Sequence, residues 1–287
     1  QDPTPIDMAR VGEGENPAII ALFEAHAILG REDAARAAAA ALDRLLASVP
    51  GSGPLLHRIH PAPVPGLDPP LAMDHIMLAR AAIAGYEVTG EPRFLAAARD
   101  MVDRAVALFW DGEAGGFFDI VADPTAPGFL NLRRRLSNDT AYPSLNSIAA
   151  RVLDRLWLHT GTESYRERAQ TCLAGLISMT GKVDQHDAGL GIALAEHQSP
   201  PARYVVIGAR NESTSALVRA ARRLYDPGKI VQHLEPGRDD AEIRRLGLDP
   251  KPDAAYAVMC REGKCSAPAG DEASLTKLGR PSRSQSE

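Results

Sequence analysis

Aromatic side chains are scarce in this sequence, and long apolar runs are missing. Phe, Trp and Tyr make up 5% of the 287 residues, so we expect a core of Ala, Leu, Ile and Val. No apolar run approaches the ~18 residues that a membrane-spanning helix needs. The Ala-rich stretch over residues 34–49 is interrupted by Arg36, Asp43 and Arg44. These absences predict a soluble globular chain without a membrane span.

Cysteine is also rare. Cys172, Cys260 and Cys265 are too few for a disulfide framework. Residues 261–264 are expected to form a hairpin turn, so Cys260 and Cys265 would face each other across two strands. They are a candidate disulfide if the protein is exported. Cys172 falls on an amphipathic helix and is expected to be buried.

An excess of positive charge is lacking as well. The formal net charge is −5, which argues against nucleic acid as the main partner, because such a partner requires a concentrated basic surface. The dense basic cluster is Arg133, Arg134 and Arg135. Three arginines in a loop favour a solvated surface over a phosphate site.

The chain begins with Gln1, followed by a polar, proline-rich segment. This start indicates either an internal boundary or a mature N-terminus left after removal of a signal. A cytoplasmic and a periplasmic or exported location are both consistent with it.

A repeated helix-turn-helix pattern is the strongest feature that is present. Three segments align, over residues 18–49, 74–110 and 147–177. Each has a first helix of about 15 residues, a turn with a glycine and an acidic residue, and a second helix rich in Ala and Arg. A glycine after the last helical residue adopts a left-handed C-cap without steric cost. Short turns of this kind make the two helices antiparallel neighbours.

The connections between the hairpins are long, over residues 50–73 and 111–144. In a hairpin array, each long connection lies at the end where the first helices begin. Function usually resides in elaborate loops over a rigid scaffold. We therefore expect any site on this long-loop face.

A fourth helix is expected near residues 186–197, and the hydrophobic period changes after it. Strands are expected at 203–208, 229–234 and 254–260, with a helix at 213–225. The predicted organisation is an extended N-terminal arm (1–15), a hairpin domain (16–200), a small α/β appendage (201–270) and a mostly disordered tail (271–287).

Several short stretches resemble a known family when they are taken together. They are TGEPRF at 89–94, FWD at 109–111, GGFFD at 115–119, Asp139 with YPSLNS at 142–147, VVIG at 205–208 and YAVMCREGKC at 256–265. Their order resembles the C-terminal part of the YyaL-type thioredoxin-domain-containing family, which includes spermatogenesis-associated homologues. The resemblance covers roughly residues 16–270.

The resemblance implies a mainly α fold, a partial α/α toroid of helical hairpins similar to six-hairpin glycosidases and N-acylglucosamine 2-epimerases, with a small C-terminal α/β appendage. It also implies carbohydrate handling, although a fold alone does not determine function. We expect the family's thioredoxin-like domain and early hairpins to be absent, so no redox activity carries over. Leu145 replaces a glycine of the family's Pro-Ser-Gly-Asn-Ser.

Polar residues gather at the starts of the first helices. A toroid would bring them to a central mouth, where Asp74 and Asp139 are candidates for the general acid and base of glycoside chemistry. A sugar epimerase would instead use a His or a carboxylate with a shifted pKa. The candidate substrate-binding residues are His75, Trp110, Phe118, Tyr142, Asn146 and His186.

These candidates also have structural interpretations. Asp74, Ser144 and Asp187 stand where helix N-caps belong, and we favour capping over catalysis. Trp110 and the Phe117–Phe118 pair favour a place in the hairpin core over an aromatic wall. His57 and His60 have a metal-ligand spacing but no helix and no third ligand nearby, so we predict no metal and no cofactor.

Two functions remain open. The first is a non-catalytic or degenerate toroid domain, an accessory subunit of a larger assembly, because an open array leaves apolar helical flanks for another chain or a second copy to cover. The second is a carbohydrate-active enzyme, either an isomerase or epimerase or a glycosidase, with a sugar ligand on the long-loop face. We favour the first, since no acid/base pair stands out in the sequence.

Overall fold

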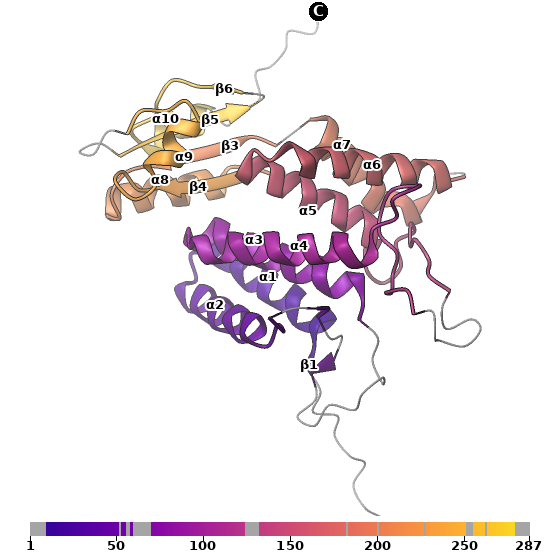
Figure 1. The fold of residues 1–287 in the computed structure, drawn as a ribbon. Coiled ribbons are helices and arrows are strands. Elements are labelled where there is room, and N and C mark those ends of the chain that lie inside the picture. Colours follow the sequence, from indigo (N-terminus) through magenta and orange to yellow (C-terminus); the bar gives the residue numbers. More distant parts are fainter. Residues whose placement is uncertain are drawn as a thin grey trace, which may run out of the picture. The chain divides into compact units, whose positions relative to one another are not determined.

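The computed structural model describes most of the chain. The described residues are 10–51, 53–55, 58–59, 70–123, 132–181, 183–199, 201–226, 228–250, 255–261 and 263–278. Helices dominate the first two thirds of the chain, and a small sheet follows (Figure 1). The predicted mainly α fold with an α/β appendage is confirmed.

The predicted hairpins are present with their expected turns. The helices are α1 (Gly12–Leu29), α2 (Glu32–Ala47), α3 (Ala72–Thr89), α4 (Pro92–Phe109), α5 (Leu145–Thr160), α6 (Glu163–Met179) and α7 (Ala188–Gln198), with the 3-10 helix η2 (Gln185–Asp187) before α7. Gly30, Gly90 and Gly161 end α1, α3 and α5 with φ angles of 71°, 69° and 69°. Each donates its N–H to the carbonyl four residues earlier, at 2.7–2.9 Å. The left-handed C-caps predicted from the glycines are therefore confirmed.

Ala, Leu, Ile and Val make up most of the buried core, as the low aromatic content predicts, and Phe23, Phe94, Phe109 and Phe117 are buried with them. On α2, the residues Ala34, Ala38, Leu42 and Leu45 are buried at helical spacing. Helix α5 packs against α6 and α7. A two-residue antiparallel ladder joins β1 (Arg10–Val11) to β2 (Arg58–Ile59).

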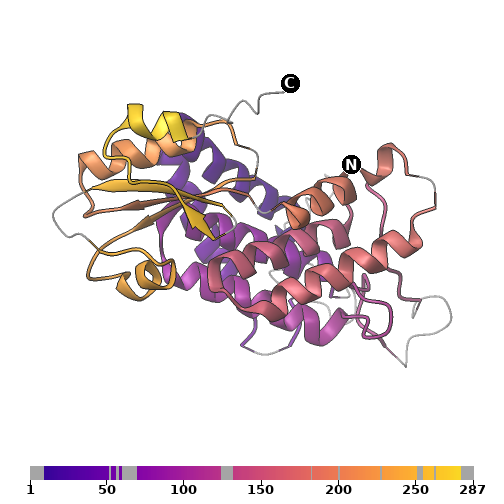
Figure 2. The ribbon, with the colours of Figure 1, turned by 90° about the horizontal axis from the view of Figure 1, so that it is seen from above.

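The appendage is a four-stranded sheet covered on both faces. Its strands are β3 (Arg203–Ile207), β4 (Ile230–Leu234), β5 (Tyr256–Arg261) and β6 (Lys264–Cys265), in the order β4-β3-β5-β6. Strand β3 is parallel to β4 and antiparallel to β5. Helices α8 (Glu212–Arg223) and α10 (Glu272–Leu278) cover one face, and α9 (Asp240–Arg245) covers the other (Figure 2).

The chain divides into two compact units. The first contains Gln1–Leu22, Ala37–Gly85 and Glu91–Gln198, and the second contains Phe23–Arg36, Tyr86–Gly90 and Ser199–Glu287. The second unit thus combines the appendage with two hairpin ends. Within it, Arg222 donates to the carbonyl of Val88 at 3.1 Å, and Gln232 donates to the Tyr86 hydroxyl at 3.1 Å. The domain boundaries predicted from the sequence stay predictions.

Both ends of the described chain carry more structure than expected. Helix α1 begins at Gly12, inside the predicted extended arm. Helix α10 occupies the first part of the predicted disordered tail, and its Leu275 is fully buried. Leu275 packs into the α8 side of the sheet, a tertiary contact that local composition does not reveal. Within the described residues, no helix combines the length and the apolar character needed to cross a membrane.

Candidate functional site

Asp139 lies in the long loop before α5 and joins the starts of two helices. Its Oδ1 accepts the N–H of Ser144 at 2.8 Å, and its Oδ2 accepts the N–H of Gly189 at 2.6 Å. A side chain on Gly189 would not fit, because an added Cβ would lie 2.6 Å from Oδ1. The loop is also held through its main chain, since the Asp139 N–H donates to the His186 carbonyl at 2.7 Å. Both carboxylate oxygens of this predicted acid or base are therefore bound to backbone donors.

His75 is fully buried in the first turn of α3. Its Nε2 accepts the N–H of Leu55 at 2.9 Å, so the ring proton is on Nδ1, which donates to the Leu71 carbonyl at 2.9 Å. The ring also packs edge-on against Phe109, with centroids 5.2 Å apart. Burial lowers the pKa of His75 from 6.5, and the Arg104 charge adds to this effect. These contacts make His75 a neutral bridge between a loop and α3.

Asn146 is also fully buried, at the start of α5. Its Oδ1 accepts the N–H of Phe117 at 2.6 Å, and its Nδ2 donates to the carbonyls of Phe117 and Leu136 at 3.0 and 3.1 Å. The amide therefore pairs with the loop as a strand would. Gly116 allows this close approach, because a Cβ there would lie 2.9 Å from the Asn146 oxygen.

The neighbouring Cys172 thiol is fully buried beside Asn146. Burial raises the pKa of Cys172 to about 12, so the thiol stays protonated near neutral pH. A protonated thiol is a poor nucleophile and a poor metal ligand. Its predicted burial is confirmed.

The predicted aromatic residues pack into the hairpin. Phe117 is fully buried, and the Trp110 ring meets it edge-on with centroids 5.0 Å apart. The Arg133 guanidinium lies 4.0 Å above the half-buried Phe118 ring. Trp110 and Phe117 thus contact each other, and Arg133 covers one face of Phe118.

Tyr142 and His186 are the exposed members of the predicted set. The Tyr142 side chain has an exposed fraction of 46%. The exposed His186 ring approaches the Asp139 carbonyl through Nδ1 at 3.3 Å. Both lie where the α5 and α7 loops meet, and they retain polar groups that a ligand can reach.

The helix-capping interpretation is correct at Ser144, correct in part at Asp187 and wrong at Asp74. Ser144 caps α5, accepting the N–H of Ser147. Asp74 is not a cap, because α3 begins two residues before it; its side chain is buried in the first turn. At η2 the cap is Asp184, and Asp187 completes a reciprocal capping box with it. Helix α3 therefore begins two residues earlier than the sequence predicts, which is a typical error for a helix boundary.

A carboxylate–imidazole pair that the sequence analysis did not identify joins α5 to α7. The Asp154 oxygens both lie 3.0 Å from His197 Nδ1. Burial raises the pKa of Asp154, and the opposing attraction of His197 limits that rise. Next to this pair, Arg151 donates to both oxygens of Glu196 at 2.7 and 2.8 Å. Asp154 and His197 lie in two different predicted helices, 43 positions apart, so no local sequence spacing predicts their contact.

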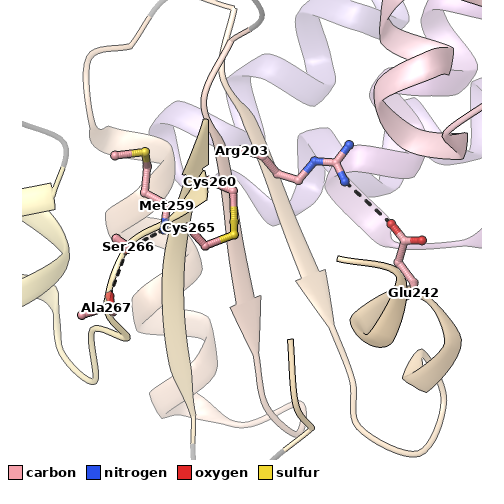
Figure 3. Close-up of a disulfide and its surroundings, with 7 residues drawn as sticks. All are labelled: Arg203, Glu242, Met259, Cys260, Cys265, Ser266 and Ala267. Atoms are coloured by element: carbon pink, nitrogen blue, oxygen red, sulfur yellow. Dashed lines mark hydrogen bonds and ion pairs between the residues drawn. A yellow bond between two sulfur atoms is a disulfide. The ribbon is translucent and has the colours of Figure 1, made fainter. Parts of the chain in front are cut away.

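Cys260 and Cys265 are joined by a disulfide between β5 and β6 (Figure 3). Beyond the disulfide, the Ser266 hydroxyl accepts the Met259 N–H and donates to the Ala267 carbonyl. On β3, the buried Arg203 is the cross-strand neighbour of Cys260, and its side chain extends away from the disulfide to within 3.8 Å of Glu242 on α9. The disulfide therefore ties down the short edge strand rather than forming part of a polar site.

The described residues contain no group of three or more His, Cys, Asp or Glu side chains arranged to hold a metal. His57 and His60, whose spacing fits that of metal ligands, lie outside the described residues.

Comparison with known sequences gives distant relatives. No family model matches the chain. It is 29% identical over 213 residues to human spermatogenesis-associated protein 20, covering 72% of this chain and 27% of that protein. The mouse protein of the same name is 27% identical over 210 residues. The chain thus spans about a quarter of the length of these curated relatives.

Comparison with solved structures supports the fold. An alpha-mannanase of glycoside hydrolase family 76 from Bacteroides thetaiotaomicron matches with a TM-score of 0.54 and 15% identity, over 78% of this chain and 58% of that one. Cellobiose 2-epimerase from Bacillus thermoamylovorans matches with a TM-score of 0.51 and 12% identity, over 78% of this chain and 66% of that one. The chain has the six-hairpin glycosidase-like α/α toroid fold in part.

Proposed function

We propose that this chain is a non-catalytic toroid domain that acts through protein contacts, as an accessory part of a larger assembly or of a self-associated particle. The observation that supports this most strongly is the Asp139 carboxylate. Both its oxygens accept backbone N–H groups, from Ser144 and Gly189. A general acid or base needs a proton-accepting position turned toward the substrate. In Asp139, one acceptor position of each oxygen is taken by a backbone N–H, and these two bonds join the starts of α5 and α7.

The other predicted side chains have similar roles. His75 and Asn146 are buried and hydrogen-bonded to backbone groups of neighbouring loops. Such contacts stabilise the long loops without any ligand. In the spermatogenesis-associated relatives, the matching segment is about a quarter of a longer protein. This also favours a domain that works as one part of a larger unit.

Partner contacts require accessible apolar surface, and the hairpin unit has it. Among the described residues of α6, α7 and the loop between them, Ile177, Met179, Val183 and Ile192 are exposed, with exposed fractions of 41–72%. Large apolar side chains of this kind mark interaction sites when they gather on a surface. A second copy or another chain would cover them.

The test combines a turnover assay with a measurement of mass. The chain is incubated with α-mannan, cellobiose and D-mannose, and sugar signals are followed by NMR. We expect unchanged sugars, together with a particle mass above that of one chain in light scattering when the natural assembly is isolated. Sustained conversion of a sugar by a monomer would overturn the proposal.

The Asp154–His197 pair supports a second candidate, a carbohydrate-active enzyme. A carboxylate that holds Nδ1–H leaves Nε2 as the basic nitrogen, which is the arrangement of a general base. The solved neighbours include a mannanase and an epimerase. If turnover is found, His197→Asn keeps a donor toward Asp154 but removes Nε2. Loss of turnover with unchanged folding would assign the base to His197 and not to Asp74 or Asp139.

A further inference from the structure

Residues 132–137, the segment that leads toward α5, belong to none of the helices and strands of the described chain. The exposure of their side chains alternates: Leu132, Arg134 and Leu136 are exposed, and Arg133 and Arg135 are half-buried. This period of two is that of a β-strand lying on a surface. The exposed fractions of Leu132 and Leu136 are 65% and 39%, so two apolar side chains face outward.

One edge of this segment is already paired. Asp119 donates its N–H to the Arg134 carbonyl at 2.9 Å, and its Oδ1 accepts the Arg134 N–H at 2.8 Å. Two residues further, the Leu136 carbonyl accepts the Asn146 amide. In an extended chain, the N–H and C=O of one residue point to one side and those of the next residue to the other. The even-numbered residues therefore form the inner edge.

The odd-numbered residues form the other edge. Across the described residues, no hydrogen bond reaches the main-chain N–H or C=O of Arg133 or Arg135. Their side chains are anchored instead: Arg133 lies over Phe118, and Arg135 donates to the Gly115 carbonyl at 3.0 Å. The segment is thus held in place with an unpaired edge, which is a template for another strand.

The segment itself carries three guanidinium groups and no carboxylate. Arg134 is paired with Asp119 at 3.4 Å and Arg135 with Asp111 at 3.3 Å, whereas Arg133 rests on an aromatic ring. The Arg134 side chain remains 68% exposed in its pair, so an incoming carboxylate can reach it.

We propose that residues 132–137 bind an extended segment of a partner protein by β-strand addition, and that this segment carries an acidic side chain between two apolar ones. The acidic residue would lie opposite Arg134, and the apolar residues opposite Leu132 and Leu136. The inference rests on the proposed interaction function and names the class of partner.

The binding experiment uses the fluorescein-labelled peptide Val-Thr-Glu-Thr-Val-Thr and fluorescence polarisation. Its core reads the same in both directions, so it matches parallel and antiparallel pairing. Arg134→Glu should weaken binding of this peptide about tenfold. The same variant should bind Val-Thr-Lys-Thr-Val-Thr, in which lysine replaces the glutamate, about as tightly as the wild type binds the first peptide. Arg36→Glu makes the same charge change at an exposed position on α2, so it is the matched control and should bind as the wild type does. Absence of binding, or weakening without the charge-swap rescue, overturns the proposal.

Main-chain pairing is tested with two variants of one residue. Arg133→Ala and Arg133→Pro both lose the contact with Phe118, but the proline also loses the N–H of the open edge. The proline variant should bind the peptide about tenfold more weakly than the alanine variant. Thermal unfolding of both variants confirms that they are folded. Equal affinities would exclude strand addition.

Hydrogen–deuterium exchange locates the peptide. The amides of Arg133 and Arg135 should exchange more slowly when it is bound. Protection of other amides would overturn the site at residues 132–137 but not the proposed interaction function. Turnover of a sugar would overturn the interaction function but would not change the peptide affinity measured by fluorescence polarisation. A dimer of this chain that Arg133→Pro dissolves would show a second copy as the occupant, and would overturn the assignment to a partner segment.

Discussion

At the scale of single residues, the polar side chains of the long-loop face act mainly on the backbone. Asp139, His75 and Asn146 each bind main-chain groups of a segment distant in the sequence. Unpaired backbone groups in a buried loop are costly, so these side chains replace a secondary structure that the loops lack. The same residue types lining a cleft would indicate catalysis. Here their hydrogen-bond partners are backbone groups, which indicates a structural role.

The contribution of His75 to the free energy of unfolding should depend on pH. Burial lowers its pKa, so the stability gained from the neutral ring is present above its unfolded pKa and is lost as the pH falls toward the folded one. His75→Gln keeps an acceptor for the Leu55 N–H but does not titrate. The free energy of unfolding of the wild type, minus that of the variant, should decrease between about pH 7.5 and about pH 5 in denaturant titrations. A constant difference would mean that His75 is not held neutral.

At the scale of elements, the hairpin turns depend on left-handed glycines. Gly30 has φ +71°, and an added Cβ would meet nothing within 4 Å. Gly30→Ala should therefore lower the free energy of unfolding by about 1–2 kcal/mol through backbone conformation alone. Gly181→Ala is the matched control, since it is equally open but has no positive φ. Its effect should stay within about 0.5 kcal/mol. Equal effects in calorimetry would contradict the assigned turn.

The pairing of α5 with α7 is a second element-scale feature. Arg151 and Glu196 form a two-bond ion pair, with side chains 33% and 26% exposed. Because this pair is partly shielded, a double-mutant cycle with Arg151→Met and Glu196→Gln should give a coupling of about 0.5–1 kcal/mol. The Arg93–Asp43 pair, with side chains 52% and 46% exposed, should couple less strongly. The reverse order would show that burial does not govern these pairs.

At the scale of the whole molecule, local signals predicted the elements but not their long-range contacts. The glycines, the alanine-rich helices and the apolar strands around residues 205 and 231 are readable because each depends on neighbours in the sequence. The roles of Asp139 and Gly189, or of Asp154 and His197, depend on residues more than 40 positions away. For this reason the hairpins and the α/β appendage were predictable from the residues, and the partial toroid from the family resemblance. The role of each polar residue, in contrast, required knowledge of its contact partners.

The central claim is that the long-loop face is held together by its polar residues. The measurement that tests it most directly is the free energy of unfolding of Asp139→Asn, with the exposed Asp43→Asn as control. The amide turns an NH₂ group toward one of two backbone N–H donors, so the account predicts a loss of about 1–3 kcal/mol at Asp139. The loss at Asp43 should be much smaller. An Asp139→Asn variant as stable as the wild type would contradict the account and return this carboxylate to the candidates for chemistry.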